Sequence, residues 1–161
     1  PPTTTEARMR LPLLLLLPVA LAACDRGHPV RAAAPMATTS QAVTVGGATL
    51  QASTVALADL TPAVATRYGI ATGSEGALLL VTVRDADDNA LAPGDLALQA
   101  TATVLPDPPA PLALREIRTG ELVDYIGEVR AKAPASVQFR LSATRGGSRA
   151  EMTTTADVQP R

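Results

Sequence analysis

One short stretch of the chain, which reads DADDN, is rich in oxygen-bearing side chains. Asp85, Asp87 and Asn89 place oxygen atoms at its first, third and fifth positions, as the opening of a calcium-binding loop does. The rest of that pattern is missing, because Ala90 stands where the turn glycine belongs and Leu96 where a bidentate glutamate would close the site. We expect a solvated hairpin tip here, with a divalent-metal site as the alternative.

Three carboxylates further along could do acid–base chemistry of the glycosidase kind: Glu116, Asp124 and Glu128. The competing interpretation is a hairpin that turns at residues 119 and 120. Such a hairpin would set Arg115 opposite Asp124, Arg118 opposite Glu121, and Leu114 opposite Tyr125. Exposed ion pairs of this sort are common and contribute little to stability. We therefore expect structural ion pairs and no catalytic carboxylates.

Other catalytic groups are poorly supplied. His28 is the only histidine and precedes the expected domain, which excludes a histidine-dependent triad or a multi-histidine metal site inside it. Lys132 is the only lysine, and Ser136 follows four residues later, a spacing that would permit a Ser-Lys dyad on a helix. Pro134 lies between them in a strand-rich segment, so that spacing is not helical. The sequence predicts a protein that is not an enzyme and carries no cofactor.

The N-terminal segment has the order of an export signal. A leucine-rich apolar run over residues 11–23 follows Arg8 and Arg10 and ends in small residues. The run is shorter than the roughly 20 apolar residues a membrane-spanning helix needs, and two prolines interrupt it. We expect residues 1–23 to be a removable signal peptide. Met9 stands where a short signal would begin, which leaves open whether residues 1–8 are a translation-start artefact.

Leu21-Ala22-Ala23-Cys24 resembles the lipobox of bacterial lipoproteins. The resemblance implies that Cys24 is lipidated and becomes the mature N-terminus, anchored by two acyl chains, which stable membrane attachment requires. Cys24 is the only cysteine in 161 residues, so no internal disulfide competes for it. Asp25 resembles the inner-membrane retention signal of enteric-type sorting, a rule that varies between bacteria and leaves the inner or outer membrane open. The alternatives are an unlipidated secretory signal and a buried thiol.

Composition argues against nucleic acid as a partner. The formal net charge is −1, which provides no basic field for nucleic acid. The only aromatic residues are Tyr68, Tyr125 and Phe139, too few for a base-stacking platform. Either tyrosine could still lend its hydroxyl to a protein partner.

A tether and one domain follow the signal. Residues 24–41 are rich in Ala, Pro and Thr and read as a flexible tether, and residues 42–158 read as one β-sandwich domain. A single helix is expected over residues 62–68, where Thr61 can cap the start, Pro62 suits the first position and Gly69 ends it.

Period-two patterns predict about seven or eight short strands. They fall at residues 43–45, 49–57, 77–83, 96–104, 112–118 and 121–129, with the proline-dense residues 106–111 expected to stay outside any ladder. A final hairpin turning at Gly146 and Gly147 sets Val137, Phe139, Leu141 and Ala143 opposite Ala156, Thr154, Met152 and Ala150. The pattern predicts two packed antiparallel sheets with one short helix.

Short motifs in a fixed order resemble a known family. They are Thr61-Pro62-Ala63-Val64-Ala65, Tyr68-Gly69-Ile70, Arg115-Glu116-Ile117-Arg118 with Gly120, and Asp124-Tyr125-Ile126. Over roughly residues 49–158 they resemble the bacterial family of exported proteins called domain of unknown function 4426. The resemblance implies a small immunoglobulin-like sandwich with no assigned activity. Members often carry an acidic residue where Ala63 stands and a second tyrosine where Asp124 stands.

These observations predict a bacterial envelope lipoprotein, held in the cell membrane by lipid on its periplasmic side. Its domain is expected to be a non-enzymatic binding or structural module. A partner protein of the envelope would bind at a sheet edge or near Tyr68 and Tyr125. The alternatives are a periplasmic module that binds a small ligand or divalent metal, and a hydrolase using the carboxylates.

Overall fold

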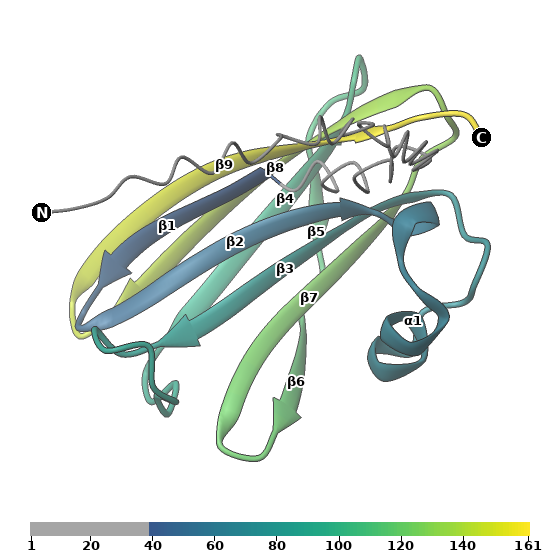
Figure 1. The fold of residues 1–161 in the computed structure, drawn as a ribbon. Coiled ribbons are helices and arrows are strands. Elements are labelled where there is room, and N and C mark those ends of the chain that lie inside the picture. The colour runs from purple at the N-terminus through teal and green to yellow at the C-terminus, as the bar shows by residue number, and fades with distance from the viewer. Residues whose placement is uncertain (1–38) are drawn as a thin grey trace, which may run out of the picture. The chain divides into compact units, whose positions relative to one another are not determined.

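The structure, a computed structural model, describes residues 39–161. This part of the chain forms nine strands in two antiparallel sheets with one α-helix and one 3₁₀ turn (Figure 1). The five-stranded sheet A has the order β1-β2-β3-β7-β6, and the four-stranded sheet B has the order β5-β4-β8-β9. The predicted antiparallel sandwich with one short helix is confirmed. The strand count exceeds the expected seven or eight.

The bounds are β1 Thr39–Val45, β2 Ala48–Ala56, η1 Leu57–Asp59, α1 Pro62–Tyr68, β3 Gly76–Arg84, β4 Ala97–Val104, β5 Ala110–Leu112, β6 Arg115–Thr119, β7 Leu122–Arg130, β8 Ala135–Arg145 and β9 Ser148–Val158. β1 begins three residues before the expected domain start, so residues 39–41 of the expected tether pair with β2. Within residues 39–161 no helix has the length and apolar character needed to cross a membrane.

The last hairpin, β8–β9, has the predicted register. Val137 pairs with Ala156, Phe139 with Thr154, Leu141 with Met152 and Ala143 with Ala150. These inward residues are buried, apart from the half-buried Ala150. A slip of one residue would turn either strand inside out, so the apolar alternation excludes that slip, and the turn at Gly146 and Gly147 sets the register.

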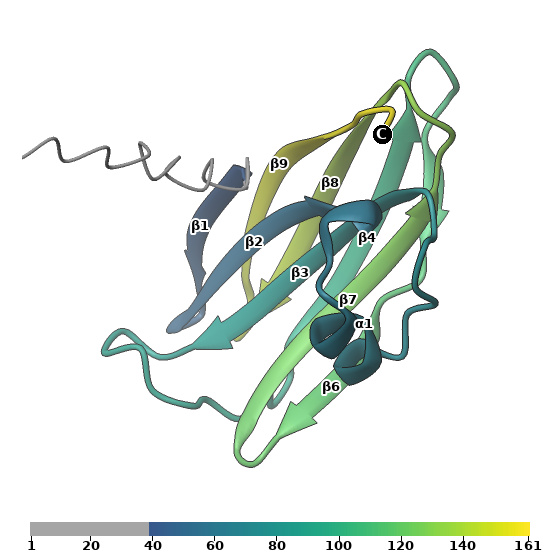
Figure 2. The same cartoon turned by 45° about the vertical axis from the view of Figure 1, so that its right-hand side comes forward.

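Helix α1 occupies the predicted residues and covers part of the outer face of sheet A (Figure 2). The Thr61 hydroxyl accepts a hydrogen bond from the Val64 amide at 3.4 Å, and Gly69 ends the helix with a φ of 64°. A second apolar cluster lies here: Leu57, Ala65, Ile70, Leu78 and Ile126. The helix explains why β3 is apolar on both faces, since Leu79 packs in the main core and Leu78 under the helix.

The single strand expected over residues 112–118 is wrong. β5 belongs to sheet B and β6 to sheet A, and the chain crosses between the sheets at Ala113 and Leu114. The expectation that residues 106–111 join no ladder also fails at its end, because Pro111 pairs with Thr101. β5 is the edge strand of sheet B, where a proline is tolerated because its missing N–H can face solvent.

The turn between β6 and β7 also differs from the expectation. Thr119 pairs with Leu122, so the two turn residues are Gly120 and Glu121. Gly120 has a φ of 62°, and two-residue hairpin turns of one favoured type require glycine at this first central position. The register moves by two residues, and Arg115 pairs with Ile126 in place of Asp124.

The two sides of the sandwich differ. On one side β1 and β9 lie close together (Figures 1 and 2), and the buried Thr54 hydroxyl of β2 donates to the Thr155 carbonyl of β9 at 3.0 Å. On the other side the edges are β5 in sheet B and β6 in sheet A. The crossing segment, Ala113 and Leu114, connects these two strands along the chain. The sandwich is open on this side.

Candidate functional site

A cleft of about 780 Å³ lies on the open side of the sandwich. Residues 126–129 of β7 form one wall, Pro111 and Leu112 of β5 the other, and Ala102 and Val104 of β4 contribute from behind. Asp107, Arg115 and Glu128 bring charge to its rim. The size falls in the usual range for a binding cleft, about 300–1,000 Å³.

Gly127, which lines this cleft, allows two leucine side chains to approach β7 closely. A Cβ atom at Gly127 would lie 2.8 Å from Leu112 Cδ2 and 3.1 Å from Leu114 Cδ2. Leu112 of β5 and Leu114 of the crossing segment therefore pack against the backbone of Gly127. The sequence carried a signal for this contact, because an isolated glycine inside a strand pattern indicates a close approach. The site predictions did not include it.

Arg115 holds the end of helix α1 against the sheet. Its Nη2 donates to the main-chain carbonyl of Tyr68, the last residue of the helix. A cation at this end of a helix interacts favourably with unpaired carbonyl groups. The Tyr68 side chain packs against the cluster under the helix. The polar group of Tyr68 that accepts the hydrogen bond from Arg115 is its backbone oxygen.

Tyr125 lies on the opposite face of sheet A, where its ring packs against the main core. Its hydroxyl donates to Glu116 Oε2 at 3.2 Å. Burial raises the pKa of the Tyr125 hydroxyl above its usual value, and the negative charge of Glu116 raises it further. Tyr68 and Tyr125, both predicted to bind a partner, are therefore separated by the sheet and do not form one site.

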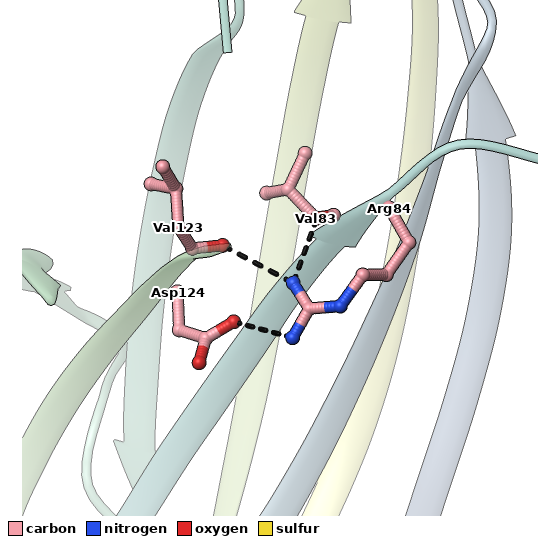
Figure 3. A network of polar contacts seen from close by, with 4 residues as sticks. All are labelled: Val83, Arg84, Val123 and Asp124. Atoms are coloured by element: carbon pink, nitrogen blue, oxygen red, sulfur yellow. Dashed lines mark hydrogen bonds and ion pairs between the residues drawn. The ribbon is translucent and has the colours of Figure 1, made fainter. Parts of the chain in front are cut away.

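Each predicted catalytic carboxylate is in contact with an arginine. Asp124 Oδ1 accepts from Arg84 Nη2 at 3.0 Å, and Arg84 also donates to the carbonyls of Val83 and Val123 (Figure 3). The ion-pair partner of Asp124 is therefore Arg84, and not Arg115 as expected. Glu116 accepts from Arg118 Nε at 2.5 Å, and Glu128 lies 4.0 Å from Arg130.

The strand period places these carboxylates on different faces. Glu116 lies on the face of Tyr125, whereas Asp124 and Glu128 share the face of Ile126. Catalytic carboxylates of a glycosidase flank one bond. Glu116 and the other two are separated by the sheet.

Arg115→Met is expected to lower the free energy of unfolding by about 1 kcal/mol, because the Tyr68 carbonyl loses its charged donor. Arg118→Met is the matched control: it removes an exposed ion pair to Glu116 and should cost less than about 0.5 kcal/mol. Urea denaturation of both variants measures the difference. Equal effects would show that Arg115 does not hold the helix.

The DADDN loop uses its own carboxylate to close the turn. Asp85 Oδ1 accepts from the amides of Asp87 and Asn89, each at 2.8 Å, and Oδ2 accepts from Asn89 Nδ2 at 3.2 Å. The amide of Asn89 makes the largest contribution to lowering the pKa of Asp85 below 3.8. Within the described residues, His, Cys, Asp and Glu form no group of three suited to a metal ion.

An acid titration tests this loop. The lowered pKa means that the contribution of Asp85 to stability is present above its unfolded value and is lost as pH falls through its folded value. NMR should therefore show a carboxyl midpoint for Asp85 below 3.8, with the Asp87 and Asn89 amides titrating in step. Millimolar calcium should leave these amides unshifted at neutral pH. A saturable calcium-dependent shift would instead support the divalent-metal alternative.

The remaining predicted residues fall in two groups. Lys132 is exposed in the loop before β8, Ser136 lies within β8, and no hydrogen bond joins them, so the dyad is not assembled. The predicted lipidation residue Cys24, the sorting residue Asp25 and His28 lie outside the described residues.

The short motifs identified in the sequence converge at one corner of the fold. Ile70, Ile117 and Ile126 come from three motifs and pack in the cluster under α1. Gly69, Arg115 and Ile126 also line the cleft. The motif residues therefore fix the helix against the sheet and border the cleft at the same time.

Comparison with known proteins identifies a matching family and a solved structure with a similar fold. The sequence profile of a family described as Domain of unknown function (DUF4426) matches residues 43–156. The crystal structure of a DUF4426 family protein from Pseudomonas aeruginosa PAO1 is similar at 14% identity, with a TM-score of 0.57 over 76% of this chain and 96% of that one. At this identity the similarity concerns the fold alone.

Two structures of FetP from uropathogenic Escherichia coli strain F11 are more distant. A copper-bound variant matches with a TM-score of 0.49 and 9% identity over 75% of this chain and 97% of that one. The as-isolated form, expressed in the periplasm, has a TM-score of 0.48 and 9% identity over 76% and 98%. No curated protein matches.

Proposed function

The chain belongs to the DUF4426 family, and from this premise we propose that it is a bacterial envelope lipoprotein whose sandwich is a non-enzymatic binding module facing the periplasm. In this proposal two acyl chains on Cys24 hold the domain at the membrane through the tether. The partner is another protein of the envelope.

The cleft on the open side is the observation that carries the proposal. One side of the sandwich is joined by Thr54 and Thr155, whereas the other leaves about 780 Å³ between β7 and β5. A cleft lined by apolar side chains, with a few charged groups at its rim, is suited to recognition. Sandwich domains serve widely as binding modules, which adds an argument by analogy of fold.

The candidate catalytic groups support the non-enzymatic part of the proposal. Asp124 is tied to Arg84, and Glu116 to Arg118 and Tyr125. A general acid or base needs a poised proton and access to substrate. Carboxylates already paired with guanidinium groups are poorly suited to that role.

Site-specific photocrosslinking in living cells tests the proposal. A photoreactive amino acid replaces Asp107 at the rim of the cleft, and in a matched control it replaces Glu151, which is exposed on β9 of sheet B. We expect a discrete crosslinked envelope protein from position 107 and none from position 151. Failure to crosslink at 107, or the same products from both positions, would count against a binding role for the cleft.

A further inference from the structure

Strand β7 is longer than the neighbour that pairs with it at the open side. β6 starts at Arg115, opposite Ile126, whereas β7 continues to Arg130. On its other side β7 pairs with β3 as far as Arg130. Residues 128–130 are therefore bordered by a partner strand on one side only, and the cleft lies beside Glu128 and Val129.

The backbone groups on this free edge can be assigned from the hairpin. Thr119 and Leu122 flank the two-residue turn and form a hydrogen-bonded pair, so alternate residues of β7 direct their N–H and C=O groups toward β6. The same alternation directs the groups of Glu128 and Arg130 to that side. No hydrogen bond outside the ladders occupies these groups within residues 39–161.

Two edge strands of the sandwich, β5 and β9, carry protective features that residues 128–130 lack. Pro111 lies in β5, and β9 receives a hydrogen bond from Thr54. Natural sheets prevent further strand pairing with prolines on the edge or by covering the edge with another part of the fold. An unpaired stretch of edge is a template for an extended chain.

The side chains along the edge specify what kind of chain would fit. Glu128 and Arg130 lie on the solvent face of sheet A, and Val129 between them packs toward the main core. Opposite charges across two strands are favourable, and like charges are not. An antiparallel strand would therefore place an acidic residue opposite Arg130, an apolar residue opposite Val129 and a basic residue opposite Glu128.

We propose that the free edge of β7, residues 128–130, binds an extended segment of a partner protein by strand addition, with the sequence order acidic, apolar, basic. The apolar side chain enters the cleft, and the two charged side chains pair with Arg130 and Glu128. This proposal rests on the proposed binding function and assigns its site.

A second copy of the chain carries the same order in Glu128, Val129 and Arg130, but it fits less well. In an antiparallel pair its Ala131 would lie opposite Gly127. Leu114 directly precedes Arg115, which faces Ile126, so the crossing segment already occupies the position beside Gly127. A short peptide segment can end or bend away there.

Fluorescence anisotropy with two labelled peptides tests the proposal. The protein used is the full chain without its signal peptide, residues 1–23. One peptide carries Asp-Val-Lys flanked by threonines, and the other the reversed order Lys-Val-Asp. We expect the first to bind about tenfold more tightly, since two favourable and two unfavourable charge pairs differ by about 1.4 kcal/mol. The double variant Glu128→Arg with Arg130→Glu should reverse this preference.

Two further measurements separate backbone pairing from charge alone. Glu128→Pro removes an N–H that points away from β3 and should abolish binding of both peptides while thermal unfolding stays cooperative. Chemical-shift changes on binding should centre on residues 127–130. Equal binding of both peptides, an unchanged preference in the charge-reversed variant, or a concentration-dependent dimer in sedimentation that blocks the peptides would overturn the proposal. Crosslinking from position 107 that persists in Glu128→Pro would retain the binding function and reject this edge as its site.

Discussion

Cys24→Ser is expected to abolish the attachment of lipid to the protein. Lipid is added to a thiol, so a serine leaves the precursor unmodified, and the protein accumulates either as uncleaved precursor or outside the lipid-anchored fraction. Stable anchoring of a lipoprotein requires two acyl chains. Because the variant carries neither, we expect the lipid anchor to be lost completely. Fractionation with detergent phase separation and mass spectrometry of the N-terminus measure the change.

Asp25→Asn is the matched control for this experiment. It leaves the thiol and the preceding small residues unchanged, so lipidation and cleavage should proceed, and only the distribution between inner and outer membranes is expected to change. If Cys24→Ser is still processed and remains in the lipid-anchored fraction, lipidation at Cys24 is wrong.

Phe139→Ala is expected to have the largest effect on stability. Phe139 is 1% exposed in the main core, and its cross-strand neighbours Ala102 and Thr154 are too small to fill the space left by the ring. Truncating a buried phenylalanine typically costs about 3–5 kcal/mol. For a domain of this size that corresponds to a melting temperature lower by roughly 10–20 °C.

Leu105→Ala provides the comparison, because Leu105 is 53% exposed and should change stability by less than about 0.5 kcal/mol. Chemical denaturation followed by circular dichroism measures both variants. A change of less than about 1 kcal/mol for Phe139→Ala would mean that the core repacks around the missing ring, in conflict with its small neighbours.

Elements governed by neighbouring residues could be predicted from the sequence. Helix α1 appears at residues 62–68 because capping by Thr61 and the glycine at position 69 are local effects. The β8–β9 hairpin has its predicted register because two adjacent glycines set the turn and the apolar alternation excludes a slip. In each case the residues that decide the structure lie within a few positions of the element.

The turn at Gly120 and Glu121 shows where this local reasoning fails. Two possible turns contain Gly120, and they differ in the turn position that this glycine occupies. The expected charge pairs favoured the wrong turn. Exposed ion pairs contribute too little to set a register. In the observed register, Ile117 and Ile126 both pack under the helix.

By itself the sequence predicted most of the strand and helix content and the family resemblance of the short motifs, and it supplied the hypotheses of an export signal over residues 1–23 and of lipidation at Cys24. Only the tertiary structure decided which strands pair over long distances, such as β3 with β7, and that the chain changes sheets at Ala113 and Leu114. A period-two pattern fixes which face of a strand is buried and leaves its neighbour in the sheet undetermined. The open side, the cleft and the free edge at Glu128 and Arg130 follow from those long-range pairings.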